Sequence, residues 1–246
     1  MTVLSANPLQ SATNDHPIDH CDSADSCDLW FIRHGETDWN AAHRMQGRTD
    51  IPLNALGHAQ AAALVPLLAH AHAQRPFAAV YATPLQRAQQ TAAPLAAALG
   101  MPVGIIADLQ ERAFGIIEGE PYAVVREGVG RTPELTVVAQ ALHARDPDYL
   151  PPPGDTGAAE TLQFFYDRVV RGAQFLAVKH PSTRIAVVVH GGVLDCLWRW
   201  ANGVGLKPHR TWSTVNASIN VLRVANNTEQ ATVLAWGVQA DAGVVP

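Results

Sequence analysis

Two kinds of apolar segment alternate along this 246-residue chain: short continuous runs, and longer stretches in which apolar residues recur every three to four positions. The continuous runs predict strands buried on both faces; they lie at 29–32, 78–82, 103–106 and 185–189. The periodic stretches predict amphipathic helices; they lie at 54–71, 84–99, 162–176 and from 190 to about 200. Asn54 is a suitable N-cap for the first of these helices, and Gly100 with Pro102 ends the second.

Strands that are separated by helices pair in parallel, with right-handed crossovers that place helices over both faces of the sheet. We therefore predict an α/β fold, a three-layer α/β/α sandwich around a mostly parallel central sheet. Two further apolar runs, at 219–224 and 231–236, predict closing strands near an edge. Residues 28–246 are expected to form a single domain, because a chain of this length supports one sizeable core.

Two segments fall outside this alternation. Residues 1–27 are polar and show no periodicity, so we interpret them as a mobile leader. Their acidic and histidine residues lack a known metal-ligand spacing, and we predict no metal site anywhere in the chain. Residues 120–153 combine short helical pieces with irregular stretches and end in a proline-rich turn, which indicates a lid-like excursion. Its apolar residues are expected to form the core of that lid.

Composition excludes several classes of function. The chain has 17 Lys and Arg against 22 Asp and Glu, a net charge of −5, which gives no general affinity for nucleic acid or anionic membranes. Lys179 and Lys207 are its only lysines, so Schiff-base chemistry and P-loop nucleotide binding have almost no candidates. Three cysteines, with no secretory signal and no membrane-spanning apolar run, lead us to expect a soluble cytoplasmic protein.

Charged and polar residues follow each predicted strand, where ligands bind in folds of this kind. The first strand is followed by Arg33 and His34, the second by Arg87 one helical turn on, the third by Glu111 and the fourth by His190. Guanidinium groups match the oxygens of a phosphate dianion, and an imidazole with one nitrogen held by a backbone carbonyl presents the other as a nucleophile. A nearby carboxyl group can protonate a leaving alcohol and then activate water. Glycine after each histidine is expected to let backbone N–H groups approach the same oxygens.

These residues carry a resemblance to the histidine phosphatase superfamily, also called the phosphoglycerate mutase-like family. The matching motifs, in family order across about 28–238, are Arg33-His34-Gly35-Glu36-Thr37-x-Trp39-Asn40, Gln46-Gly47-x-x-Asp50-x-Pro52-Leu53, Thr83-x-x-x-Arg87-Ala88, Leu109-x-Glu111 with Glu118-Gly119, and Val189-His190-Gly191-Gly192. The resemblance implies a phosphoglycerate mutase-like fold and chemistry that needs no cofactor.

The resemblance also implies residue roles. His34 is the expected phosphorylated nucleophile and Glu111 the acid and base. Arg33, Arg87 and His190 are expected to bind the transferring phosphoryl group. Asn40 and Gly191 are expected to support the bound phosphate. The expected substrate contacts are Gln46, Gly47, Thr83, Arg112 and Tyr122.

Family members either hydrolyse phosphate esters or move phosphate within phosphoglycerate. The resemblance implies what a mutase of this family would carry. A tyrosine follows the catalytic glutamate, a lysine comes soon after it, and an Arg-Arg pair comes later. This chain has Phe114 at the tyrosine position, Tyr122 near the lysine position and no Arg-Arg pair between 120 and 153. We therefore expect a pocket too poor in cations for a mutase, and a phosphatase that acts on a small phosphorylated metabolite.

Two other functions remain open, a cofactor-dependent phosphoglycerate mutase and a phosphoester-binding module without activity. The presence of both His34 and Glu111 argues against the second. A small metabolite is the expected partner, with no nucleic acid and no membrane. A homodimer is the expected assembly, although no sequence feature specifies it.

Overall fold

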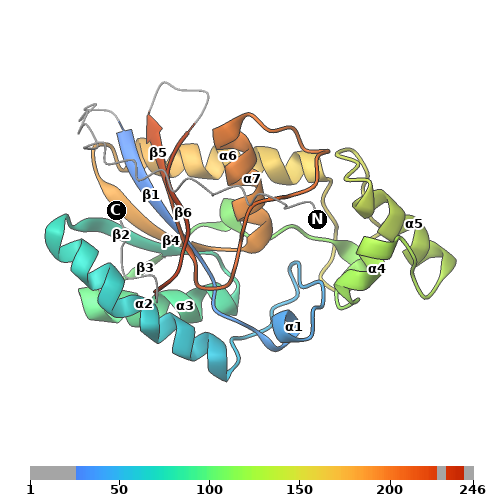
Figure 1. The fold of residues 1–246 in the computed structure, drawn as a ribbon, viewed down its shortest axis with the longest axis horizontal. Helices are drawn as coiled ribbons and strands as arrows, with labels where there is room; N and C mark the ends of the chain where they lie inside the picture. The colour runs from blue at the N-terminus through green and yellow to red at the C-terminus, as the bar shows by residue number, and fades with distance from the viewer. Residues whose placement is uncertain (1–25, 226–230, 241–246) are drawn as a thin grey trace, which may run out of the picture.

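A computed structural model describes residues 26–225 and 231–240, and its centre is one six-stranded sheet (Figure 1). The sheet has the order β3-β2-β4-β1-β5-β6. Its strands are β1 (Ser26–Arg33), β2 (Phe77–Ala82), β3 (Val103–Ile105), β4 (Arg184–Val189), β5 (Ile219–Ala225) and β6 (Thr232–Val238). The first four are parallel where they pair, and β5 and β6 add two antiparallel pairings at one side. The predicted α/β fold with a mostly parallel sheet is confirmed.

Helices cover both faces of this sheet because side chains alternate in direction along each strand. In β1, Trp30 and Ile32 pack with α2 (Ala55–Gln74) and α3 (Gln86–Leu99) on one face. Leu29 and Phe31 pack on the other face with α6 (Leu162–Lys179) and α7 (Gly191–Asn202). The three predicted layers are therefore present, and the central strands read as continuous apolar runs because both of their faces are buried.

The first strand begins earlier than the apolar pattern indicates. Ser26 and Cys27 belong to β1, and Cys27 is fully buried. The part of the predicted leader that covers these two residues is therefore wrong, since the pairing of β1 with β5 extends to Ser26. The rest of the predicted leader, residues 1–25, lies outside the described residues, as does the cluster Asp15, His16, Asp19, His20 and Cys21.

The helix ends follow the signals in the sequence. The side chain of Asn54 accepts a hydrogen bond of 2.8 Å from the Gly57 backbone N–H and caps α2. Gly100 ends α3 in the left-handed conformation, with φ 64°, which a glycine adopts without steric cost.

Between β3 and α6 the chain leaves the sheet and forms the excursion predicted for residues 120–153. Two short 3-10 helices, η1 (Ala107–Leu109) and η2 (Gly115–Ile117), lead into α4 (Tyr122–Glu127) and α5 (Pro133–His143). Figure 1 shows α4 and α5 side by side at one end of the molecule, away from the sheet. Their apolar residues surround Ile117, Val138 and Ala139 in a small core of their own, and the segment 120–153 is called the lid from here on.

Helix α5 is longer and more regular than the apolar pattern indicates. Its start carries three standard helix signals that could have predicted it: Thr132 as N-cap, Pro133 at the first position and Glu134 in the first turn.

Two glycines allow α2 to pack against the segment that follows β1. A Cβ at Gly57 would lie 2.0 Å from the carbonyl oxygen of Glu36, and a Cβ at Gly35 would lie 2.5 Å from the carbonyl oxygen of Gly57. Gly57 looks like a flaw in a helix when it is read from the sequence. In the fold it is the position at which two backbones meet, next to His34.

We predict that Gly57→Ala lowers the free energy of unfolding by about 1–3 kcal/mol, because the added methyl group overpacks this contact. Helix propensity alone predicts the opposite sign, a gain of about 0.5–1 kcal/mol. Urea unfolding measures the difference. Gly205→Ala is the control, because its Cβ would meet nothing within 4 Å. A Gly57→Ala variant as stable as the wild type would show that the backbones do not need this approach.

Candidate active site

Two histidines lie side by side at the edge of the sheet where β1 and β4 end. The two strands pair in parallel with Arg33 opposite Val189, and the His34 backbone N–H donates a 3.0 Å hydrogen bond to the Val189 carbonyl oxygen. His34 and His190 are therefore the first residues beyond equivalent ends. Their ring centroids are 5.2 Å apart, and both side chains are buried. The predicted convergence of these two residues is present.

His34 is held as a neutral imidazole with one free nitrogen. Its Nδ1 lies 2.7 Å from the carbonyl oxygen of Gly35, so Nδ1 carries the proton and donates it, and Nε2 keeps its lone pair. Burial lowers the pKa of His34 well below its usual value, and the positive charges of Arg87 and Arg33 lower it further. The site therefore presents an uncharged Nε2 at neutral pH.

His190 is also neutral, and Thr83 orients it. Burial lowers the pKa of His190 far below its usual value, and the positive charge of Arg87 lowers it further. The Thr83 hydroxyl lies 2.7 Å from Nε2, and Nδ1 has no hydrogen-bond partner among the described residues. If the Thr83 hydroxyl donates to Nε2, the ring carries its proton on Nδ1. That tautomer leaves His190 with an unused N–H donor.

Arg87 is fixed before any ligand arrives. It lies in the first turn of α3 with only 1% of its surface exposed. Its Nη1 donates to the carbonyl oxygen of Thr49 over 2.9 Å, and its Nη2 donates to that of Gly47 over 2.7 Å. Burial lowers the pKa of Arg87 to about 10, so the guanidinium stays charged at neutral pH.

Arg33 is held from a loop that the sequence did not indicate. Its Nη1 donates to the carbonyl oxygen of Thr214, in the segment between α7 and β5. The sequence-based prediction considered only residues that follow parallel strands. The segment that contains Thr214 precedes β5, which is antiparallel, so it was missed. Because β5 runs antiparallel to β1, it brings the residues that precede it to the same edge. An antiparallel closing strand is the signal that could have found Thr214 and also Arg210, which lies in the same segment and lines the same cavity.

Glu111 follows η1 and lines the same cavity as His34. Its Oε1 accepts a 2.9 Å hydrogen bond from the Arg112 backbone N–H, and its Oε2 accepts one of 2.9 Å from the Gly192 backbone N–H. A Cβ at Gly192 would lie 2.2 Å from Oε1 of Glu111. Gly192, which sequence reasoning left unassigned, is therefore the glycine that lets α7 approach this carboxylate. A Cβ at Gly191 would make only ordinary contact with Arg33, at 3.5 Å.

The expectation that glycine after each histidine frees a backbone N–H for the ligand is wrong for the first histidine. The Gly35 N–H donates to the Thr91 hydroxyl over 2.9 Å. This glycine is needed for the approach of α2 described above. Gly191 begins α7 on the cavity wall, where the first N–H groups of a helix point outward along its axis. It remains a candidate for contact with an anion.

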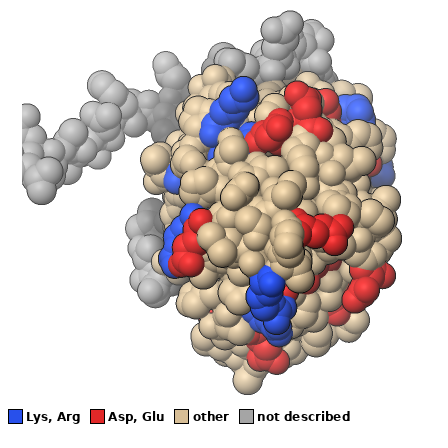
Figure 2. All heavy atoms as spheres, turned by 90° about the vertical axis from the view of Figure 1, so that its right-hand side faces the viewer, with Lys and Arg blue, Asp and Glu red and all other residues tan. Residues whose placement is uncertain are grey.

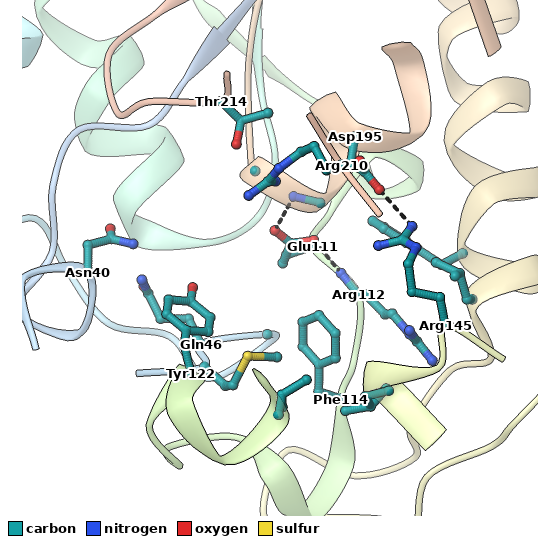
Figure 3. Close-up of a pocket in the computed structure, with 18 of the residues that line it drawn as sticks. Asn40, Gln46, Glu111, Arg112, Phe114, Tyr122, Arg145, Asp195, Arg210 and Thr214 are labelled. Carbon is teal, nitrogen blue, oxygen red and sulfur yellow. Dashed lines mark hydrogen bonds and ion pairs between the residues drawn. The ribbon is translucent and has the colours of Figure 1, made fainter. Parts of the chain in front are cut away.

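Asn40 and the predicted substrate contacts divide between the cavity wall and the structure behind it. The Asn40 Oδ1 accepts from the backbone N–H and hydroxyl of Thr37, the N-cap of α1 (Asp38–Ala41), and completes a capping box. The amide nitrogen of Asn40 faces the cavity (Figure 3). Thr83 is fully buried against His190 and is not on the wall, which corrects its assignment as a substrate contact. The other four predicted contacts, Gln46, Gly47, Arg112 and Tyr122, all line the cavity.

The cavity has a volume of about 700 Å³ and is bounded by the sheet edge, α7 and the lid (Figure 3). Its walls carry six arginines and three carboxylates: Arg33, Arg87, Arg112, Arg126, Arg145 and Arg210, with Glu111, Asp146 and Asp195. The expectation of a pocket poor in cations is therefore wrong. The additional arginines come from the turn after Glu111, from the lid and from the loop before β5, and no motif spacing relates them.

The described residues contain no group of three or more His, Cys, Asp or Glu side chains arranged to hold a metal ion. None of the helices in 26–225 and 231–240 is both long and apolar enough to cross a membrane. Cys27, which stands six residues before Arg33, lies inside β1, and burial raises the pKa of its thiol to about 12. It is a core residue.

Comparison with known proteins identifies the family. Residues 29–237 match the model of the histidine phosphatase superfamily (branch 1), and the chain belongs to this family. It is 32% identical over 217 residues to phosphoglycerate mutase-like protein 4 of Arabidopsis thaliana, which covers 88% of this chain and 87% of the relative. It is 33% identical over 201 residues to a metal-independent phosphoserine phosphatase of the same plant, covering 80% of this chain and 76% of the relative.

Among solved structures, the fold is similar to that of Bacillus stearothermophilus YhfR. The TM-score is 0.68 at 26% identity, over 87% of this chain and 98% of that one. The resemblance drawn from the sequence motifs is confirmed.

We predict that the two buried imidazoles make the free energy of unfolding fall as the pH drops below about 6.5. In that range the unfolded chain binds protons at positions 34 and 190 that the folded protein does not bind, because both folded pKa values are lowered. Each imidazole contributes at most about 1.4 kcal/mol per pH unit. Denaturant unfolding between pH 7.5 and 5.5 measures this slope. His34→Asn should flatten it, and equal slopes in variant and wild type would contradict the lowered pKa of His34.

Proposed function

We propose that this protein hydrolyses phosphate monoesters of small molecules through a phosphohistidine intermediate on His34, without a metal ion. The observation that carries the proposal is the free, uncharged Nε2 of His34 beside buried Arg87, half-buried Arg33 and a second histidine whose Nδ1 has no hydrogen-bond partner among the described residues. Membership in the histidine phosphatase superfamily supports it, as does similarity to a relative named as a metal-independent phosphatase.

The phosphoryl group binds between Arg33, Arg87 and His190. The two guanidinium groups and the Nδ1–H of His190 donate hydrogen bonds to the nonbridging oxygens. Because Arg87 is already held by two backbone carbonyls, little side-chain entropy is lost when the phosphate binds. The N-terminus of α7 at Gly191 and the amide of Asn40 add donors at the rim.

In the first step, Nε2 of His34 attacks phosphorus while the bond from phosphorus to the ester oxygen breaks. Glu111, in its protonated form, gives its proton to the departing alkoxide. In the second step, ionised Glu111 takes a proton from water, the water oxygen attacks phosphorus, and the bond from Nε2 to phosphorus breaks. The products are the alcohol and inorganic phosphate, and His34 returns to its neutral form.

A phosphoglycerate mutase is the second candidate, and the additional arginines of the cavity favour it. A mutase holds a second anionic group and retains a bisphosphorylated intermediate, which calls for cations beyond the phosphate clamp. The tyrosine, lysine and Arg-Arg pair of the family's mutases are absent at the corresponding positions. Hydrolysis therefore remains the function that we propose.

We predict that the purified protein hydrolyses p-nitrophenyl phosphate in the presence of EDTA. His34→Ala should reduce kcat by at least about 10³-fold, because it removes the nucleophile. A label from ³²P-substrate that is stable in alkali and lost in acid, and absent from His34→Ala, identifies phosphohistidine. His70→Ala is the control for loss of a histidine, because His70 is an exposed residue of α2. Loss of activity on chelation, or full activity of His34→Ala, would overturn the mechanism.

We further predict that 3-phosphoglycerate yields inorganic phosphate and little 2-phosphoglycerate, with or without added 2,3-bisphosphoglycerate. Coupled phosphate release and ³¹P NMR of the products measure both outcomes. Isomerisation that exceeds phosphate release would establish the mutase instead.

A further inference from the structure

Arg145 stands on the lid side of the cavity in a backbone conformation that arginine rarely adopts. It follows the last turn of α5 with φ 51°, in the left-handed region where glycine is usual. A glycine here would end the helix at no steric cost, so the unusual backbone conformation is tied to the arginine side chain.

The Arg145 guanidinium is held on two of its edges. Its Nε donates to the carbonyl oxygen of Leu206 over 2.7 Å, and its Nη2 donates to Oδ2 of Asp195 over 3.0 Å. The remaining edge faces the cavity that contains Glu111 (Figure 3). A guanidinium fixed in this way offers a directed donor, in contrast to an arginine that moves freely in solvent.

Asp195 orients Arg145 but does not cancel the positive charge of this wall. The same Oδ2 accepts a 3.0 Å hydrogen bond from Nε of Arg199, so one carboxylate serves two guanidinium groups. Arg112 adds a third cation on this side, with its Nε bound to the carbonyl oxygen of Glu160. The Arg145 side of the cavity therefore brings together the guanidinium groups of Arg112, Arg145 and Arg199 against the carboxylates of Asp195 and Asp146, and it keeps a small excess of positive charge.

This charge lines the cavity, and the face drawn in Figure 2 carries no basic patch. The face of the molecule in Figure 2 shows basic and acidic side chains intermixed. Of the lid arginines on the cavity wall, Arg126 is 76% exposed and pairs with Glu127, whereas the Arg145 side chain is 18% exposed. An anion in the cavity would meet Arg145 in a partly desolvated setting, where charge–charge attraction is strong.

We propose that Arg145 binds a second anionic group, a carboxylate or a second phosphate, carried by the alcohol part of the substrate. Asp195 acts as a positioning residue that aims Arg145 into the cavity. This inference rests on the proposed function, since it places the ester phosphate at His34 and the second anion at Arg145, on the lid side of the cavity. It defines the substrate class as small phosphate esters with two acidic groups.

The test compares two substrates that differ in one group. 3-Phosphoglycerate carries a carboxylate where glycerol 3-phosphate carries a hydroxymethyl group. We expect wild-type kcat/KM to favour 3-phosphoglycerate, and Arg145→Gln to remove about 10- to 100-fold of that preference, mainly through KM. Glycerol 3-phosphate should be hydrolysed nearly as before, which also shows that the variant folds. A second comparison uses propane-1,3-diol bisphosphate and propane-1,3-diol monophosphate. It shows whether Arg145 also favours a substrate whose second anionic group is a phosphate.

Two further variants identify the cause. Arg126→Gln removes one positive charge from the same lid and should change the preference by less than about twofold, because that side chain is exposed. Asp195→Asn should lower the preference for 3-phosphoglycerate over glycerol 3-phosphate, because Arg145 loses its orienting partner. If Arg145→Gln instead slows both substrates equally, Arg145 only fastens the lid and the proposed subsite is wrong.

Binding to a variant that cannot turn over separates this inference from the proposed function. Calorimetry with His34→Ala should show tighter binding of 3-phosphoglycerate than of glycerol 3-phosphate, and His34→Ala/Arg145→Gln should lose the difference. If this preference holds but the wild type releases no phosphate, the subsite stands and the phosphatase proposal falls. If the wild type hydrolyses both substrates and His34→Ala binds them equally, the phosphatase stands and the subsite falls.

Discussion

The parallel pairing of β1 with β4 is the interaction on which the site depends. It places Arg33 opposite Val189, so that each strand ends one residue before a histidine at the same edge. The backbone hydrogen bond from His34 to Val189 extends that ladder to the first residue of the site. A shift of the register by one residue would turn these side chains to opposite faces of the sheet. The buried apolar residues of both strands fix the register and, through it, the position of the imidazoles.

Burial gives these groups their electrostatic character. Desolvation keeps both imidazoles neutral, whereas arginine stays charged when it is buried because its intrinsic pKa is so high. The site therefore combines uncharged nitrogen atoms with fixed cations in one desolvated space. Groups that are already oriented and already desolvated need little rearrangement when charge develops on a ligand.

The fold and the centre of the site could be predicted because both follow from local patterns. Runs buried on both faces identified the central strands, and the ends of those strands identified Arg33, His34, Arg87, Glu111 and His190. The outer wall of the cavity could not be predicted in this way. Arg145 and Arg210 reach it from loops whose positions depend on lid packing and on an antiparallel strand, and neither leaves a periodic signal. The sequence places Thr83 directly after β2 but indicates a substrate contact there, and only the structure shows that its hydroxyl contacts His190 instead.

The rigidity of Arg87 has a consequence for the stage after the ester bond is broken. Its guanidinium is locked by the carbonyl groups of Gly47 and Thr49, so it keeps the same position once the alcohol has left. Free orthophosphate presents the same oxygens as the ester and meets the same donors. A clamp that is assembled in advance therefore offers the same donors to orthophosphate as to the ester, so the two compete for one site.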